Sequence, residues 1–371
     1  MTEVLPPTTV AAPDDPVREA AVTWIAQASL LVVEGADRAR FLNAVVTQDL
    51  AGLGPGGGAY GALADDRGHA LSDFRVYAGE EFLLLELPVA ASEPVYGALE
   101  RLVVADDVRL GWSELGMVAV ESADAARAVL ALEAAGAPAA CEVAWLAAPE
   151  PGLYAPAGAA GPVPGMVLRA SRLGAIGAAL TIARADAPRA LELAAGAGAV
   201  AAGRALVSRL EIEAGCPGIE TEFARAGVLP ELGLAGAVSF DKGCYPGQEI
   251  LNRLRTRGRL QRRLAGVILE DSGGEAWSGA ELESPDSAGA RAGSPGSEGA
   301  PAGTVTRAAY SPSLRATVAL AFVRRDFWEP GTELAARKEG GRTTARVARL
   351  PFVEYRGKGA ARSPWLAAEE T

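Results

Sequence analysis

The segment FDKGCYPGQEI, residues 240–250, brings together two residue types that are scarce in this chain. The sequence has only three lysines among its 35 Lys and Arg residues and only three cysteines, yet Lys242 and Cys244 stand two positions apart. Pro246 is typical of a first helical turn, so we expect Cys244 just before a helix N-terminus and beside a cation. Both features stabilise a thiolate, which predicts a reactive thiol or a soft ligand donor. The alternative is that Cys244 is a small buried hydrophobic residue.

A basic stretch follows this segment directly. NRLRTRGRLQRR, residues 252–263, contains no acid and six arginines, namely Arg253, Arg255, Arg257, Arg259, Arg262 and Arg263. In a chain of net charge −11, such a cluster predicts a local site for an anion. The alternatives are a solvated basic face and ion pairs with the surrounding acids.

Other residues that could carry chemistry are few. The single histidine, His69, has no partner that the sequence identifies, and the three cysteines lie 75 and 28 residues apart, so we expect no metal site. The glycine-rich segment at 52–61 lacks the lysine of a phosphate-binding loop and is expected to be a turn. Asp73, in LSDFRVY, is either an exposed strand residue or a general base in a cleft.

Composition narrows the class of protein. With 371 residues, of which 49% are hydrophobic, the chain is long enough for two or three packed domains. No apolar run approaches the roughly 20 residues that cross a bilayer, and the start does not resemble a signal peptide. The acidic net charge argues against strong binding to nucleic acid or to an anionic membrane. Because cysteines are few and scattered, we expect a reducing, cytoplasmic location.

The elements that must position these residues follow an α+β pattern. Residues 29–112 read as strand, helix, strands, helix and strand, and a second unit of strands and helices starts near Met117. A helix within 200–218 is expected to end at Gly215. From Leu264 onward, strands separated by turn residues predict a small β-barrel or sandwich.

Three segments have compositions that are typical of poor order. The Pro-rich residues 1–20 are expected to form a flexible arm. A Ser/Gly/Pro/Ala-rich stretch at about 284–303 is expected to be a disordered insertion, and residues 357–371 a loose tail.

The signature and its neighbours resemble a known family. DKGCYPGQEILNRLRTRG resembles the K-G-C-Y-x-G-Q-E motif of the YgfZ-type folate-binding proteins, tRNA-modifying or iron–sulfur assembly factors. Those proteins are similar in fold to the aminomethyltransferase, or T-protein, of the glycine cleavage system. Weaker similarities cover most of the chain in order, at GADRARFLNAVVTQDL, RGHALSDFRVY, RLEIEAGCPGIETE and AGTVTRAAYSPSLRATVALAFV.

This resemblance implies a fold of three lobes around a central folate site. The corresponding units are a first α+β lobe at 21–116 that is completed by 200–258, a second lobe at 117–199 and a C-terminal β-barrel at 259–356. The resemblance also implies tetrahydrofolate, or a one-carbon derivative of it, as the cofactor. The partners that it implies are iron–sulfur client or assembly proteins, and we expect a monomer.

The resemblance further implies roles for individual residues. Glu213 matches the helix-end acid that meets the pterin ring in the aminomethyltransferases, and a carboxylate suits the donor edge of a pterin. Tyr245 and Phe240 are expected to stack on the ring system. The arginines that match the anionic glutamate tail are Arg253, Arg262 and Arg263. The other signature residues assigned to cofactor binding are Gly247, Gln248 and Glu249.

The chain also departs from the aminomethyltransferase pattern. Those enzymes usually carry two adjacent acids where this chain has Ser72 and Asp73, so only the second acid is retained. They generally lack a cysteine at the position of Cys244. Both differences favour the YgfZ branch. A usual Thr-Ser pair in the C-terminal segment is Thr306-Arg307 here, which weakens that match.

Three functional hypotheses follow. In the first, the protein is a folate-dependent accessory factor for iron–sulfur cluster assembly or repair, with Cys244 as nucleophile or transient cluster ligand and Lys242 stabilising its thiolate. In the second, it is an aminomethyltransferase or another tetrahydrofolate-dependent one-carbon transferase, with Asp73 as base or electrostatic anchor. In the third, it is a non-catalytic folate-binding module.

Overall fold

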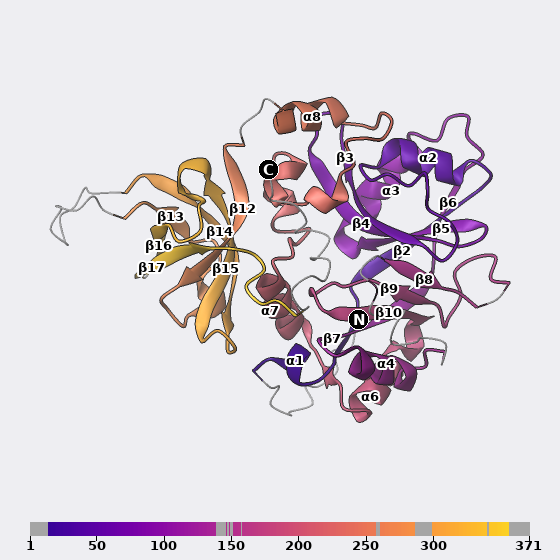
Figure 1. Ribbon diagram of the computed structural model, residues 1–371, viewed down its shortest axis with the longest axis horizontal. Coiled ribbons are helices and arrows are strands. Elements are labelled where there is room, and N and C mark those ends of the chain that lie inside the picture. The colour runs from indigo at the N-terminus through magenta and orange to yellow at the C-terminus, as the bar shows by residue number, and fades with distance from the viewer. Residues whose placement is uncertain are drawn as a thin grey trace.

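The computed structural model describes residues 14–138, 146, 148, 151–156, 158–256, 260–285, 299–339 and 341–355. Two β-sheets with covering helices lie beside a closed C-terminal barrel, as Figure 1 shows. This arrangement confirms the predicted α+β fold class, including the barrel.

The first sheet has the strand order β3-β4-β5-β2-β6, and its neighbouring strands are antiparallel. Its strands are β2 (Ala28–Glu34), β3 (Gly58–Ala64), β4 (Ala70–Ala78), β5 (Phe82–Pro88) and β6 (Arg109–Trp112). The helices α2 (Arg38–Val45) and α3 (Ser92–Glu100) cover one face, where Phe41 and Val95 pack with Phe74 of β4. Asp37 directly precedes α2.

The second sheet has the strand order β11-β1-β7-β10-β9-β8. Its strands are β1 (Val22–Ile25), β7 (Leu115–Ser122), β8 (Gly152–Tyr154), β9 (Val167–Arg169), β10 (Ile176–Ala183) and β11 (Val200–Ala201). Apolar residues of α4 (Ala125–Ala134) and α6 (Ala187–Gly196) pack on its outer face.

The position of β1 differs from the sequence-based grouping with the first lobe. β1 pairs with β7 in antiparallel and with β11 in parallel orientation, so it belongs to the second sheet. Its backbone groups gain partners on both sides there, whereas β2, the next strand in the chain, already lies between β5 and β6.

The inner faces of the two sheets pack on each other. Leu30, Tyr77 and Leu84 of the first sheet share a buried cluster with Met117 and Leu168 of the second. Each fully buried side chain of this size contributes roughly 1.5–3 kcal/mol. Polar groups on these inner strands are therefore removed from water and need partners inside the protein.

Two helices connect the sheets to the barrel. α7 (Arg204–Ala214) lies between the sheets and the barrel and contacts the barrel strands β14 and β15 (Figure 1). It ends at Gly215 as predicted, because this glycine adopts the left-handed conformation with φ 76°. The helix expected after the signature is α8 (Gln248–Thr256).

The barrel closes in the order β12-β15-β14-β13-β16-β17, and β17 pairs back on β12. Its strands are β12 (Arg262–Leu269), β13 (Glu281–Glu283), β14 (Pro301–Ser311), β15 (Ala316–Arg324), β16 (Glu333–Lys338) and β17 (Gly341–Ala348). Short 3-10 helices join the elements: η1 (Val89–Ala91), η2 (Arg184–Asp186), η3 (Phe223–Arg225), η4 (Leu229–Leu232), η5 (Ala235–Ala237), η6 (Gly274–Trp277) and η7 (Arg325–Phe327). Among the described residues, no helix combines the length and the apolar character that a bilayer span requires.

Parts of the segments expected to lack order belong to the fold. Residues 14–20 include α1 (Pro16–Glu19), which is capped by the Asp15 side chain and buries Val17 in the core between the sheets. β14 already begins at Pro301, and Ala302 is fully buried in the barrel. The arm and the insertion are thus shorter than predicted, because apolar residues near their ends are buried. The remainder of these predictions, at 1–13, 286–298 and 357–371, lies outside the described residues.

Candidate functional site

Lys242 caps the C-terminal end of α2. Its ammonium donates hydrogen bonds to the carbonyl oxygens of Val46 at 2.9 Å and Gln48 at 2.8 Å, and also to that of Asn43. Carbonyls at a helix C-terminus carry partial negative charge and lack partners within the helix. Burial lowers the pKa of Lys242 to about 8. This lysine therefore fastens the signature loop to α2, across nearly 200 residues of sequence.

Cys244 lies exposed in the loop that Lys242 anchors, so it is not the buried hydrophobic residue of the alternative interpretation. The expected support from Lys242 is not seen. All three protons of the ammonium are engaged by carbonyl oxygens, and among the described residues no hydrogen bond joins it to the sulfur. Three carbonyl oxygens lie together at the C-terminal end of α2, and they, rather than the Cys244 sulfur, hold the Lys242 ammonium there.

The end of the signature packs on the turn between β3 and β4. Gly247 has φ 78°, and a Cβ atom at this position would lie 2.5 Å from the carbonyl oxygen of Asp65. Gln248 makes long hydrogen bonds, of 3.4 and 3.5 Å, to the carbonyls of Lys242 and Gly243. These two residues, which the resemblance assigns to cofactor binding, thus have contacts that shape the loop.

The aromatic residues of the signature pack between β3 and the barrel. Tyr245 is buried, donates to the carbonyl of Ser239 at 3.2 Å, and shares an apolar cluster with the partly buried Phe240. Burial raises the pKa of Tyr245 to about 12. Because the Tyr245 ring is enclosed by protein side chains, the structure gives it a packing role where the resemblance implies stacking on a cofactor.

Two of the arginines matched to a glutamate tail have partners within the protein. Arg262 forms an ion pair with Glu231 at 3.1 Å and stacks on the ring of Phe322 at 4.8 Å. Arg263 stacks on Trp328 at 4.7 Å. Both residues begin β12, and Arg262 ties the barrel to η4 through Glu231. This favours the ion-pair alternative for Arg262.

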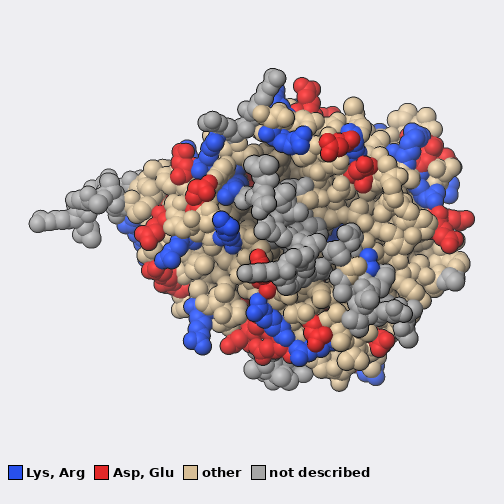
Figure 2. Space-filling view, viewed as in Figure 1, with Lys and Arg blue, Asp and Glu red and all other residues tan. Residues whose placement is uncertain are grey.

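The arginines of α8 are more accessible. Arg253 and Arg255 are exposed, and Arg255 stacks on Phe240 at 4.3 Å. Among the described residues, Arg253 has no ion pair, and none joins it to the exposed Glu249 one turn earlier in α8. Arg257 and Arg259 lie outside the described residues. Positive and negative side chains are interspersed over the face seen in Figure 2.

Asp73 of β4 is enclosed rather than exposed. Its carboxylate accepts a 2.8 Å hydrogen bond from the hydroxyl of Tyr60 in the neighbouring strand β3. Burial raises the pKa of Asp73, and the positive charge of Arg75, on the same face of β4, opposes this rise. Burial and the nearby carboxylate also raise the pKa of Tyr60. A carboxylate with a raised pKa is suited to accept a proton, as the second hypothesis requires.

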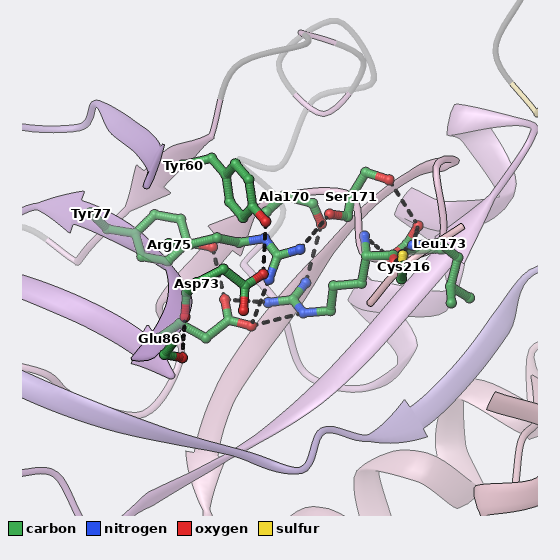
Figure 3. A network of polar contacts seen from close by, with 12 residues as sticks. Tyr60, Asp73, Arg75, Tyr77, Glu86, Ala170, Ser171, Leu173 and Cys216 are labelled. Carbon is green, nitrogen blue, oxygen red and sulfur yellow. Dashed lines mark hydrogen bonds and ion pairs between the residues drawn. The ribbon is translucent and has the colours of Figure 1, made fainter. Parts of the chain in front are cut away.

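Figure 3 shows that Asp73 borders a network of buried charges between the two sheets. Glu86 of β5 accepts hydrogen bonds from Arg172 at 2.9 and 2.6 Å, and one from Tyr77 at 3.0 Å. Arg75 lies 3.6 Å from the same carboxylate. Although burial acts in the opposite direction, the two guanidinium groups hold the pKa of Glu86 below its usual value.

A second buried carboxylate shapes the loop between β9 and β10, which carries Arg172. Glu121 of β7 accepts hydrogen bonds from the backbone N–H of Leu173 and from the hydroxyl of Ser171 at 3.3 Å. Burial raises the pKa of Glu121. The thiol of Cys216 donates to the carbonyl of Arg172 at 2.9 Å, and burial raises its pKa as well.

The sequence analysis did not identify Tyr60, Glu86, Glu121 or Arg172. A signal existed for both glutamates, because each is the only acid within an otherwise apolar run, FLLLELP and MVAVE. A charge at such a position needs a buried partner. Arg172 gave no signal, since it lies in a loop and meets Glu86 across 86 residues of sequence.

Arg307, the departure from the Thr-Ser pattern, clamps the barrel to the core. Its guanidinium forms ion pairs of 3.1 Å with both Glu222 and Glu211 and donates to the carbonyl of Cys216 at 2.5 Å. Glu222 is fully buried. The larger side chain is therefore accommodated by two carboxylates that neutralise it.

Glu213 lies in the last turn of α7 with only 2% of its surface exposed. Burial raises its pKa, and a hydrogen bond with Ser311 of β14 opposes this rise. Its Oε1 atom has no hydrogen-bond partner among the described residues. A buried polar atom without a partner costs about 1–3 kcal/mol and is uncommon in folded proteins. Oε1 is thus an acceptor that a ligand could satisfy.

The predicted site residues do not form one cluster of direct contacts. Among the described residues, no hydrogen bond or ion pair joins Cys244, Asp73 and Glu213 to one another. Likewise, no three His, Cys, Asp or Glu side chains of the described residues come together as a possible metal site. The geometry instead offers a partly buried acid at β4, a buried acid at the end of α7 and an exposed thiol.

The chain is similar in sequence to several known proteins. The family model for the glycine cleavage T-protein C-terminal barrel domain matches residues 262–354. A probable aminomethyltransferase of Natronomonas pharaonis is 27% identical over 92% of this chain and 89% of its own length. The aminomethyltransferase of Geobacillus kaustophilus is also 27% identical, over 87% of this chain and 84% of its own length. A putative chloroplastic transferase of Arabidopsis thaliana is 38% identical over 72 residues, which are 19% of this chain and 17% of that protein.

A solved structure extends the comparison to the whole fold. The glycine cleavage system aminomethyltransferase T from Bartonella henselae superimposes with a TM-score of 0.71 at 20% identity, covering 92% of this chain and 89% of that one. The names of these relatives refer to aminomethyl or other transferases, which favours the second hypothesis over the iron–sulfur hypothesis. The chain therefore has the aminomethyltransferase fold and carries a C-terminal barrel of the glycine cleavage T-protein type.

Proposed function

We propose that the protein binds tetrahydrofolate, or a one-carbon derivative of it, and catalyses one-carbon transfer of the aminomethyltransferase type. The observation that carries the proposal is the free Oε1 of the buried Glu213. The donor edge of a pterin presents adjacent N–H groups, which suit a carboxylate acceptor. The similarity to aminomethyltransferases along most of the chain supports the same cofactor.

Each acid has a separate task in this proposal. Glu213 would orient the ring system by accepting its N–H groups. Asp73 would act as base or electrostatic anchor, because its carboxylate is partly buried and already accepts a hydrogen bond from the Tyr60 hydroxyl at Oδ2. When bound, tetrahydrofolate supplies the nitrogen atoms that carry the one-carbon unit. Arg253, exposed on α8 and without an ion pair among the described residues, is the candidate contact for the anionic glutamate tail.

Calorimetric titration with tetrahydrofolate tests the binding. We expect wild-type protein to bind and Glu213→Gln to bind about ten- to a hundredfold more weakly, because a hydrogen bond to a charged group contributes about 1.5–3 kcal/mol. Glu220→Gln is the control, since Glu220 lies shortly after the end of α7 and is exposed. If wild type gives no binding, or both variants bind equally well, the assignment of Glu213 is wrong.

A turnover assay tests the reaction itself. Wild-type protein is expected to form methylenetetrahydrofolate from an aminomethylated lipoyl carrier protein, and Asp73→Asn is expected to lose this activity while still binding the cofactor. Tight binding without turnover in the wild type would instead support the non-catalytic folate-binding module.

The exposure of Cys244 within the signature supports a second candidate, a YgfZ-type accessory factor for iron–sulfur assembly or repair. In this role the thiol would be a nucleophile or a transient cluster ligand for client or assembly proteins. The test is to complement a deletion strain with Cys244→Ser. Cys216→Ser is the control, because the Cys216 thiol donates a hydrogen bond inside the protein. Normal activity of iron–sulfur enzymes with Cys244→Ser would remove this role for the thiol.

A further inference from the structure

Four segments that are distant in sequence meet around Glu213. The residue lies at the end of α7, its side chain interacts with Ser311 at the end of β14, and charges from Arg209 and Asp15 act on it. The fourth segment is 351–355, where the backbone N–H of Phe352 donates to the carbonyl of Glu213 at 2.8 Å. Residues near both ends of the described chain therefore reach the one buried acid that has a free oxygen.

Tyr355 lies at the end of this fourth segment, which bonds to Glu213 through Phe352. It is 8% exposed and belongs to the same buried cluster as Val17 of α1. Burial raises the pKa of Tyr355, and the charge of Glu213 adds to this effect. A donor group of a ligand cannot reach the Glu213 oxygen, itself 2% exposed, unless part of this enclosure moves.

The weakest part of the enclosure is the contact between α1 and residues 351–355. Arg18 holds it, because its guanidinium donates to the carbonyl of Glu354 at 2.8 Å, pairs with Asp15 at 3.3 Å and lies 5.9 Å from the centre of the Tyr355 ring. The Arg18 side chain is 56% exposed, so these contacts compete with water. α1 itself has only four residues.

We propose that α1 and residues 351–355 form a gate over Glu213, and that Arg18 keeps it closed. This inference rests on the proposed function, since it concerns access to the same cofactor site. Opening would release the exposed Arg18 clasp and the backbone hydrogen bond from Phe352 to Glu213 and would expose Tyr355, whereas moving α7 or β14 would disrupt the core and the barrel. Tyr355 serves as the ring on which Arg18 rests when the gate is closed.

Stopped-flow measurement of tetrahydrofolate binding tests the gate. Arg18→Ala is expected to raise both the association and the dissociation rate constants about three- to tenfold, because it frees a contact of about 0.5–1.5 kcal/mol. The dissociation constant is then expected to change little. A role in support of the site alone would raise only the dissociation rate. Hydrogen exchange at the amides of Phe352 and Val353 is expected to accelerate in parallel.

Three further variants complete the experiment. Arg18→Lys is expected to give rate constants between those of wild type and Arg18→Ala. Tyr355→Phe retains the ring and is expected to give the wild-type rate constants. Arg189→Ala, at an exposed ion pair within α6, is the control and is expected to leave both rates unchanged. Wild-type binding with unchanged rates in Arg18→Ala would overturn the gate and leave the proposed function intact. An absence of wild-type binding would overturn both.

Discussion

The guanidinium of Arg172, from the loop between β9 and β10 of the second sheet, binds the carboxylate of Glu86, in the first sheet, through two hydrogen bonds of 2.9 and 2.6 Å. Both side chains are at least nine-tenths buried. Paired, they neutralise each other next to Asp73 and join the two sheets at the level of the site. A bidentate pair of this kind fixes the orientation of the sheets as well as their distance.

Loss of this pair is expected to destabilise the protein strongly. Arg172→Ala leaves the buried Glu86 carboxylate with Arg75 as its remaining cationic neighbour. Removing one partner of a buried ion pair typically costs about 3–5 kcal/mol. Urea unfolding measures the effect. Arg189→Ala, at an exposed pair with Glu192, is the control and should change stability by less than about 1 kcal/mol. Equal losses in the two variants would contradict the network as a structural joint.

The Arg307 clamp is expected to behave in the same way between the barrel and the core. Arg307→Leu leaves Glu222, which is fully buried, without its cation, and should cost about 3–5 kcal/mol. Thermal or urea unfolding provides the measurement. Arg346→Leu, at an exposed pair with Glu270 on the barrel, is the control variant and should cost less than about 1 kcal/mol. A small loss for Arg307→Leu would show that Glu222 finds another partner.

Gly247 is expected to tolerate no side chain. Its φ of 78° and the 2.5 Å separation between a Cβ and the Asp65 carbonyl predict a loss of about 2–4 kcal/mol for Gly247→Ala, from backbone strain and overpacking together. Gly243→Ala, four residues earlier, meets no atom within 4 Å and is expected to stay within about 0.5 kcal/mol of wild type. Comparable losses at both positions would contradict the packing of the signature against the β3–β4 turn.

The anchor at Lys242 predicts a specific dependence on pH. Burial lowers the pKa of Lys242 to about 8 in the folded protein, below the value of about 10.4 for a free lysine. Between these values the unfolded chain binds more protons than the folded one, so the contribution of Lys242 to stability rises with pH from about 8 to about 10. Unfolding of wild type and Lys242→Met across this range measures the difference. Lys338→Met controls for the loss of a charge, and a wild-type advantage that shrinks with pH would refute the sign.

The two described cysteines are expected to differ in reactivity. Cys244 is exposed and should react rapidly with a disulfide reagent such as Ellman's reagent, whereas Cys216 donates to the Arg172 carbonyl and has a pKa raised by burial. In a Cys141→Ser background, Cys244→Ser should abolish the fast phase and Cys216→Ser should retain it. The opposite assignment of the fast phase would show that the signature loop is closed in solution.

The features that the sequence predicted correctly depend on local chemistry. Gly215 ends α7 because a left-handed residue is needed at that point, and turn residues between apolar strands indicate the barrel. The contacts of Lys242 could not be predicted from its neighbours, since its acceptors lie 194–199 residues earlier. Glu213 was identified through resemblance, but its free oxygen results from burial by four separate segments. Arg262 was expected to bind a ligand and instead satisfies Glu231.

The pairing of β1 affects the order in which the chain can fold during synthesis. β1 leaves the ribosome first among the strands, yet its partners β7 and β11 follow only about 90 and 180 residues later. The first sheet is built from the continuous stretch 28–112 and can form in that interval, while β1 waits unpaired. The inner face of the first sheet is then already in place when the second sheet packs on it. The Glu86–Arg172 joint is thus made only after one half of the site is already in place.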